Sequence, residues 1–242
     1  MKVLVACEES QAVCIEGRKL GHEAYSCDIL ECSGGHPEWH IQADVLPLLN
    51  GNCTFTTMDG VEHRIDGKWD MIIFFPPCTF LTNTGNRWFN ETVYGEKAAQ
   101  RKENRKAAAA FFMAGWNADC DKVIIENPVG CMSTMFRKPD QIIHPYYFAE
   151  KQDDENCERK ATCVWFRGVQ PLKYIIRFTP RIIAYKNGKG TDSPWHMDTM
   201  KLPPDERAKA RSKTYKGVAK AMAKQWMGES NRSREQEAWS AL

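Results

Sequence analysis

Several features that would assign the chain to a particular class of protein are missing from its sequence. No two of its ten cysteines form a Cys-x-x-Cys pair, the chain has no signal-like apolar start, and no apolar run is long enough to cross a bilayer. The first absence argues against a paired-cysteine redox or zinc site, and the others against a secreted or membrane-spanning protein. We therefore expect a reduced, cytoplasmic setting and no membrane partner.

An excess of one sign of charge is missing too. Lysine and arginine together number 33 and aspartate and glutamate 31, which leaves a formal net charge of +2. Such a balance excludes a molecule that attracts nucleic acid over its whole surface, so any such binding depends on local basic patches.

A metal site is only weakly indicated. The nearest pattern is Cys32, His36 and His40, whose four-residue steps would suit one face of a helix. Two glycines and a proline fall between them and make a poor helical face, so we expect an ordinary loop and no metal ion.

What is present is an alternation of short apolar runs with helical patterns. The 242 residues suit one α/β domain with a small loop-rich appendage, because single hydrophobic cores stop growing at roughly 250–300 residues. The alternation predicts a doubly wound, mostly parallel sheet, in which ligands bind at the carboxyl ends of the strands. Strands are expected at 2–6, 23–28, 69–75, 122–126 and 161–166, and helices at 10–20, 96–118 and 204–227, with Gly228 ending the last helix. A hairpin is expected at 53–65 as a surface insertion.

Chemically unusual residues follow two of the expected strands. Pro76 and Pro77 fix the backbone before Cys78, and Glu126 and Asn127 end the next strand of the predicted sheet. A thiol and a carboxyl at one sheet edge are the pair that covalent catalysis on a pyrimidine requires. The alternatives are a rigid turn with a structural cysteine and a helix cap, and neither pattern alone excludes them.

The order of these segments resembles the DNA cytosine-C5 methyltransferase family. Phe75-Pro76-Pro77-Cys78 is similar to its catalytic Pro-Cys motif, and Glu126-Asn127-Pro128 is similar to its Glu-Asn-Val motif. The segment 213–219 around Gly217 is similar to its glycine-containing C-terminal motif. The resemblance implies a Rossmann-like fold that binds S-adenosylmethionine.

The resemblance also implies a mechanism. Cys78 would add as a thiolate to C6 of cytosine, and Glu126 would hydrogen-bond to or protonate N3. C5 then becomes nucleophilic enough to accept a methyl group. The family's Arg-x-Arg strand motif has only Arg159-Lys160-Ala161-Thr162 as its counterpart, so Lys160 or Thr162 would brace the base in place of an arginine.

For the cofactor, the resemblance implies a site formed by the loop after the first strand and by acids after the next strands. Asp28 would hold the ribose and Asp44 would meet the adenine amino group. Glu8 and Glu9 stand where the family normally has glycine, so the identity of the cofactor is the weaker inference. The residues expected to bind the cofactor are Ala6, Cys7, Glu8, Ser10, Asp28, Asp44, Phe75, Pro76 and Gly217.

The resemblance divides the chain into a catalytic core at 1–150, a reduced recognition segment at 151–203, a C-terminal helix at 204–228 returning to the core and a polar tail at 229–242. About fifty residues separate the last expected strand from the C-terminal motif, where the family normally carries a large target-recognition domain. We therefore expect a small, orphan, phage-like member with limited reading of DNA sequence.

Two segments are expected to contact nucleic acid. The loop at 79–94 has the position of the family's loop that closes on a flipped base, and the following helix presents basic residues at a spacing of four. A plain surface loop and a solvated helix face are the alternatives. The residues expected to make these contacts are Asn83, Thr84, Arg87, Trp88, Lys97, Arg101 and Arg105.

Three hypotheses follow from the sequence. The first is methyl transfer to cytosine in duplex DNA, and the second is the same chemistry on single-stranded nucleic acid, RNA or a free cytosine nucleotide. The third is a binding protein that has kept the fold and lost the cofactor. All three leave the oligomeric state open.

Overall fold

The computed structural model describes residues 1–152, 154–185, 188 and 190–228. These residues form two compact units. The sheet unit consists of 1–11, 23–142 and 162–171, and the helical unit consists of 12–22, 143–161 and the described residues after 171. Both units are discontinuous in sequence, whereas the expected core and appendage were continuous segments. The expected polar tail at 229–242 lies outside the described residues.

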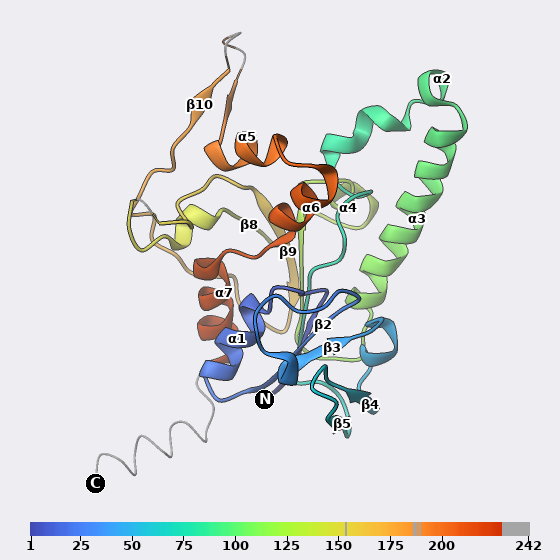
Figure 1. Cartoon of the computed structure of the whole chain (residues 1–242), viewed down its shortest axis with the longest axis vertical. Coiled ribbons are helices and arrows are strands. Elements are labelled where there is room, and N and C mark those ends of the chain that lie inside the picture. Colours follow the sequence, from blue (N-terminus) through green and yellow to red (C-terminus); the bar gives the residue numbers. More distant parts are fainter. Residues whose placement is uncertain (153, 186–187, 189, 229–242) are drawn as a thin grey trace. The chain divides into compact units, whose positions relative to one another are not determined.

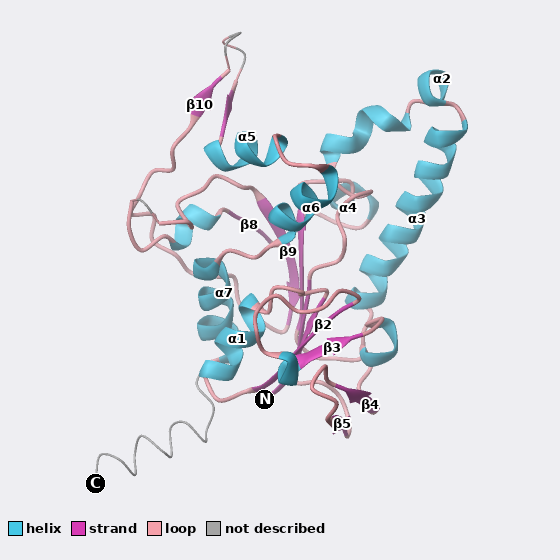
Figure 2. Cartoon of the chain, viewed as in Figure 1, coloured by secondary structure: helices cyan, strands magenta, loops and turns pink. Residues whose placement is uncertain are grey.

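A seven-stranded sheet forms the centre of the sheet unit (Figures 1 and 2). Its order is β3-β2-β1-β6-β7-β9-β8, and the neighbours from β3 to β7 are parallel, whereas β9 runs antiparallel to β7. The prediction of an α/β protein with a mostly parallel sheet is confirmed, and the sheet is compatible with a Rossmann-like fold. The strands are β1 (Lys2–Ala6), β2 (Glu23–Asp28), β3 (His40–Gln42), β6 (Met71–Phe74), β7 (Val123–Pro128), β8 (Gln141–Ile143) and β9 (Thr162–Arg167).

The central strands are apolar on both faces, as expected for a buried parallel sheet. All four residues of β6 are 0% exposed, and so are the last four of β1. In the parallel register Ala6 pairs with Phe74 on one side and with Cys27 on the other. The carboxyl ends of β1, β2 and β6 therefore meet at one edge of the sheet.

The strand order contains a reversal next to these ends. Counted along the chain, the five parallel strands have the order 3-2-1-4-5, so successive strands are added on one side of β1 and then on the other. In open α/β sheets the crevice outside such a reversal is where ligands bind. Here the reversal lies between β1 and β6, whose ends lead into Cys7 and Phe75.

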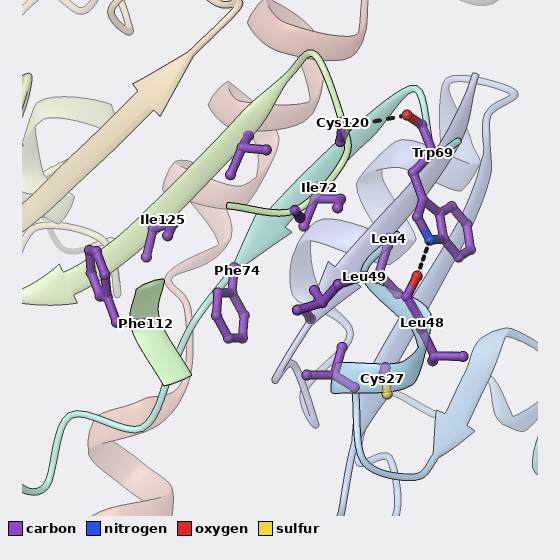
Figure 3. Close-up of a cluster of buried hydrophobic side chains, with 14 of the residues drawn as sticks. Leu4, Cys27, Leu48, Leu49, Trp69, Ile72, Phe74, Phe112, Cys120 and Ile125 are labelled. Atoms are coloured by element: carbon purple, nitrogen blue, oxygen red, sulfur yellow. Dashed lines mark hydrogen bonds between the residues drawn. The ribbon is translucent and has the colours of Figure 1, made fainter. Parts of the chain in front are cut away.

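The core beneath this edge is drawn in Figure 3. Trp69 donates its indole N–H to the carbonyl of Leu48 at 2.7 Å, and the Cys120 thiol donates to the carbonyl of Trp69 at 3.2 Å. Helix α3 (Glu96–Trp116) covers the sheet with Phe112, which is 0% exposed. Gly115 is required there, because a Cβ would lie 2.0 Å from Cδ1 of Phe74.

The expected hairpin is present as β4 (Cys53–Thr56) and β5 (Glu62–Ile65), an antiparallel pair outside the main sheet. Phe55 and Ile65 are buried and belong to the hydrophobic core of the sheet unit. This hairpin, expected as a surface insertion, therefore contributes to the core.

The region after β6 is more regular than the loop expected at 79–94. It contains a 3-10 helix, η3 (Asn83–Phe89), and a single turn, α2 (Glu91–Tyr94), and Asn90 caps α2 by accepting from the amide of Thr92. Local hydrogen bonding thus orders a stretch without an apolar period. The remaining short helices of this unit are η1 (Pro37–Trp39), η2 (Leu46–Leu48) and α4 (Met132–Met135).

The helical unit differs from its expectation near the C-terminus. In place of one helix over 204–227, three segments follow one another, because Lys213 and Tyr215 have extended backbones. Gly228, with φ 66°, ends the last of them, as expected. The elements of this unit are α1 (Ala12–Lys19), η4 (Pro145–Phe148), β10 (Ile183–Ala184), β11 (Thr191–Asp192), α5 (Pro194–Met200), α6 (Pro204–Ser212), α7 (Lys216–Met222) and the π-helical turn η5 (Ala223–Met227).

Candidate active site

The segments that carry Cys78 and Glu126 are joined to each other beyond the ends of their strands. An isolated β-bridge links Thr82 to Gly130, and the amide of Cys131 donates to the carbonyl of Leu81 at 2.8 Å. These backbone contacts fix the loop after β6 against the loop after β7. We call the residues 75–83 and 126–131 the thiol edge.

Asn127 joins the two segments a second time. Its side-chain N–H donates to the carbonyl of Pro76 at 2.7 Å, and its side chain is 2% exposed. The Oδ1 atom of the same amide is buried and has no hydrogen-bond partner within the described part of the chain. The amide therefore fixes the backbone two residues before Cys78 and keeps one acceptor unused.

Glu126 and Thr162 lie on the same face of the sheet. In the antiparallel register of β7 and β9, Glu126 pairs with Val164 and Pro128 with Thr162, which makes Glu126 and Thr162 diagonal neighbours. Burial raises the pKa of the Cys163 thiol to about 11, with a further contribution from the negative charge of Glu126. The structure thus places Thr162 diagonally beside Glu126, and its expected role in bracing the base stays a prediction.

On the other side of the strand reversal, the loop after β1 has an unusual backbone. Cys7 and Gln11 both have φ 58°, a left-handed conformation that favours glycine. The amide of Phe75 donates to the carbonyl of Ala6 at 2.9 Å, and the amide of Glu8 donates to the carbonyl of Cys27 at 3.2 Å. The left-handed residues of the loop are thus Cys7 and Gln11, and not Glu8 and Glu9, which stand where the family normally has glycine.

Acidic side chains gather around this loop. Burial raises the pKa of the Cys7 thiol well above its ordinary range, and the negative charges of Asp28, Cys27 and Asp44 raise it further. Burial also raises the pKa of Asp28, to which Glu9 adds. The expected cofactor acids therefore lie near one another and near the first loop. We call the residues 6–11, 28–36 and 43–44 the acidic edge.

Glycine is needed where two loops of the acidic edge approach. A Cβ at Gly34 would lie 2.6 Å from Cβ of Gln11 and 2.8 Å from the carbonyl oxygen of Ser10. Gln11 in turn accepts from the amide of His36 at 3.1 Å and donates to its carbonyl at 2.9 Å. The loop before β3 thus holds the side chain of Gln11.

The buried side chain of His40 completes the support of the acidic edge. Its Nδ1 lies 2.8 Å from Oγ of Ser26, and its Nε2 lies 2.9 Å from the carbonyl oxygen of Leu30. Gln11 donates to the same Ser26 hydroxyl at 3.2 Å. Both ring nitrogens of His40 are therefore engaged in hydrogen bonds, as suits a structural role.

The residues expected to contact nucleic acid fall into two groups. The helix η3 carries the exposed Asn83, Thr84, Arg87 and Trp88, and the guanidinium of Arg87 lies 4.7 Å from the centroid of the Trp88 ring. In α3, Lys97 is exposed. Arg101 and Arg105 are half-buried and donate to carbonyls of the thiol edge.

Lys160 and Gly217 belong to the helical unit, so the expected roles of Lys160 in bracing the base and of Gly217 in binding the cofactor stay predictions. Lys160 donates to the carbonyl of Arg211 at 2.9 Å and lies over the rings of Trp195 and Tyr215. The amide of Gly217 donates to Oδ1 of Asn156 at 2.6 Å.

Comparison with protein-family models and with curated proteins finds no match. The site is therefore described from its own geometry. Across the described ranges, no group of three His, Cys, Asp or Glu residues is placed to hold a metal ion. Over the same residues, no helix combines the length and the apolar character that crossing a membrane would need.

Sequence reasoning did not single out two residues that build the site. Gly130 allows the bridge of the thiol edge, because a Cβ there would lie 2.1 Å from the carbonyl oxygen of Leu81. Gly34 performs the same task in the acidic edge. A glycine just after a strand can mark a close backbone approach, and this signal could have identified Gly130. The roles of Arg101 and Arg105 had no such signal.

Proposed function

We propose that this protein transfers a methyl group from S-adenosylmethionine to C5 of cytosine in DNA, through a covalent adduct with Cys78. The observation that carries the proposal is the joining of the Cys78 and Glu126 segments beside the strand reversal. A nucleophile and a carboxyl group are held there next to the crevice in which α/β sheets bind ligands. Neither segment alone would support the proposal.

The side chains of the thiol edge would divide the chemistry. The Cys78 thiolate adds to C6 of the ring while Glu126 donates a hydrogen bond or a proton to N3, and electron density moves to C5. After methylation, a base removes the proton from C5, and the C6–S bond breaks to return the thiolate. Asn127 contributes by holding the Pro76 carbonyl at 2.7 Å, which restricts the position of the nucleophile.

The acidic edge suits a positively charged cofactor. S-adenosylmethionine, when bound, supplies an electrophilic methyl group on a sulfonium cation. The left-handed φ of Cys7 lets the first loop take a glycine-like path without glycine, and strained backbone of this kind is often found at ligand sites. Asp28, Asp44 and Glu9 place negative charge around the same loop. Asp28 and Asp44 would hold the nucleoside part, as their positions after β2 and β3 suggest.

For the substrate, the observation that favours nucleic acid is the exposed surface of η3. It presents the Arg87 guanidinium against the Trp88 ring, beside the polar side chains of Asn83 and Thr84. Arginine and exposed aromatic side chains are suited to phosphate contact and base stacking. Because η3 follows Cys78 closely in the chain, a base bound by the thiol edge would lie near these groups.

The direct test is to incubate the purified protein with methyl-labelled S-adenosylmethionine and one of four substrates. These are duplex DNA, single-stranded DNA, RNA and deoxycytidine nucleotides, and mass spectrometry of the digested product locates the label. We expect 5-methylcytosine in DNA and total loss of transfer in Cys78→Ala, because no other residue supplies the C6 nucleophile. Glu126→Gln should retain cofactor binding and lose most of the transfer.

Each other outcome would assign the protein a different substrate, mechanism or function. Label only in RNA or in free nucleotides would retain the mechanism and change the substrate. Label on the cytosine amino group, or transfer that survives Cys78→Ala, would contradict the mechanism. Absence of S-adenosylmethionine binding by calorimetry would favour a binding protein that has lost the cofactor.

A further inference from the structure

Arg101 and Arg105 approach the segment that directly follows Cys78. Arg101 donates from Nη2 to the carbonyl of Thr79 at 3.1 Å, and Arg105 donates from Nε to the carbonyl of Phe80 at 2.8 Å. The two arginines thus hold the carbonyls of the first and second residues after the nucleophile. Both project from α3, which packs against the central sheet and is a rigid support.

The same guanidiniums also hold η3. Arg105 donates from Nη2 to Oδ1 of Asn86 at 2.8 Å, and its Cζ lies 3.6 Å from the centroid of the Phe89 ring. Arg101 lies 5.1 Å from the same ring, and a Cβ at Gly85 would lie 2.6 Å from its Nη2. Each guanidinium therefore makes several directed contacts at once, which a planar fork can do and an ammonium cannot.

We propose that Arg105, assisted by Arg101, is a positioning residue that holds Cys78 in place by fixing the backbone after it to α3 and η3. This inference rests on the proposed function for its link to methyl transfer, but its structural part does not. It differs from the expectation that these arginines bind phosphates, because three of their N–H donors are directed to the carbonyls of Thr79 and Phe80 and to Oδ1 of Asn86. Their geometry is that of an internal clamp for the thiol edge.

The decisive variant is Arg105→Lys, which keeps the positive charge and loses the planar guanidinium with its several N–H donors. A phosphate contact tolerates this change well, since lysine binds phosphate as a point charge. A clamp does not tolerate it, because one ammonium cannot hold the Phe80 carbonyl and the Asn86 amide in their present directions. Arg105→Gln removes the charge as well, and Lys106→Gln is the matched control, since exposed Lys106 pairs only with Glu103 among the contacts described.

The first measurement is the rate at which iodoacetamide alkylates Cys78, followed by peptide mass spectrometry without cofactor or substrate. We expect Arg105→Lys and Arg105→Gln to alkylate about 10-fold faster than wild type, because a released segment exposes its half-buried thiol. Lys106→Gln should alkylate at the wild-type rate. Thermal unfolding of each variant checks that the variant is folded at the temperature of the alkylation experiment.

The second measurement separates kcat from KM for DNA. The clamp predicts that kcat falls about 10- to 100-fold in Arg105→Lys with KM nearly unchanged, because a small displacement of a reacting group is costly. Phosphate binding predicts a different set of results. The alkylation rate would be unchanged in both variants, Arg105→Gln would show a raised KM and a shallower salt dependence, and Arg105→Lys would restore wild-type kinetics. These results together would overturn the proposal. Faster alkylation with no methyl transfer even in wild type would uphold the clamp and refute the proposed function.

A second variant keeps the test valid if Arg105→Gln folds poorly. Asn86→Ala removes the contact between Nη2 of Arg105 and Oδ1 of Asn86, together with the 3.4 Å bond from Asn86 to Asn83. It leaves the bond from Arg105 to the Phe80 carbonyl. We expect a smaller rise in alkylation than in Arg105→Lys, and no further rise when Asn86→Ala is added to Arg105→Lys, since both act through one guanidinium. Additive effects of the two changes would contradict a shared clamp.

Discussion

The acidic edge and the thiol edge both follow the carboxyl ends of strands in the same sheet, but different contacts hold them in place. The acidic edge depends on buried side chains, in which Gln11, Ser26 and His40 form a hydrogen-bonded network under a strained loop. The thiol edge depends on backbone pairing between two loops and on arginines from α3. The comparison teaches that cofactor binding and nucleophile placement should respond to different substitutions.

The largest expected effect separates the two edges through their glycines. In Gly130→Ala the new methyl group would lie 2.1 Å from the Leu81 carbonyl oxygen and would push the two loops of the thiol edge apart. We expect methyl transfer to fall about 100-fold, because the nucleophile and Glu126 lose their alignment. Affinity for S-adenosylmethionine should be retained, and calorimetry and initial rates measure the two properties.

The corresponding variant in the acidic edge is Gly34→Ala, whose methyl group would disturb Gln11 and Ser10. It should weaken cofactor binding and leave the alkylation rate of Cys78 unchanged. If both variants lowered cofactor affinity equally, the two edges would not be independent. Thermal unfolding distinguishes such coupling from a general loss of stability.

A smaller effect is expected for the charge of the acidic edge. Asp28→Asn keeps Oδ1, which accepts from the amide of Leu30 at 3.0 Å, and removes only the negative charge. The dissociation constant for S-adenosylmethionine should rise about 10-fold, which corresponds to about 1.4 kcal/mol. Asp44→Asn is the matched comparison at an exposed site and should have a weaker effect. An unchanged affinity in Asp28→Asn would remove this acid from the cofactor site.

The two edges were also predictable to different extents from the sequence. The strands were found because their apolar runs are buried on both faces, and a thiol and a carboxyl at successive strand ends indicated the thiol edge directly. Strands β3 and β8 were missed because each has only three residues, too few to carry a measurable period. The extended break near Lys213 was missed although Thr214, Tyr215 and Gly217 are weak helix formers, because the helical pattern on both sides was read as continuous.

Contacts made at long range were the least predictable. Arg101 and Arg105 have the spacing of a basic stripe, and their spacing alone suggests a surface for phosphates. Only the fold shows that the segment after Cys78 returns to these guanidiniums across 22 and 25 residues of chain, and that η3 returns across 19. The glycine-like φ of Cys7 was equally hidden, since its side chain gives no indication of a left-handed backbone.

The smallest expected effect is a pH dependence of stability that belongs to the acidic edge. Burial lowers the pKa of His40 below its ordinary value of 6.5, although Asp28 and Glu9 oppose the shift with their negative charges. As the pH falls below 6.5, the unfolded chain binds a proton that folded His40 does not accept, so the free energy of unfolding decreases. The stabilisation is complete above this pH and is lost as the pH falls through the folded pKa.

His40→Gln should reduce this slope, which is at most about 1.4 kcal/mol per pH unit for one proton. Urea unfolding between about pH 5.5 and 7.5 measures it, because this range spans the titration of an ordinary histidine. Burial also lowers the pKa of His22 and His144 in the helical unit, so wild type and variant must be compared at each pH. Equal slopes in the two proteins would show that the pH sensitivity lies outside the acidic edge, and that the network under the first loop stays intact when the protein is acidified.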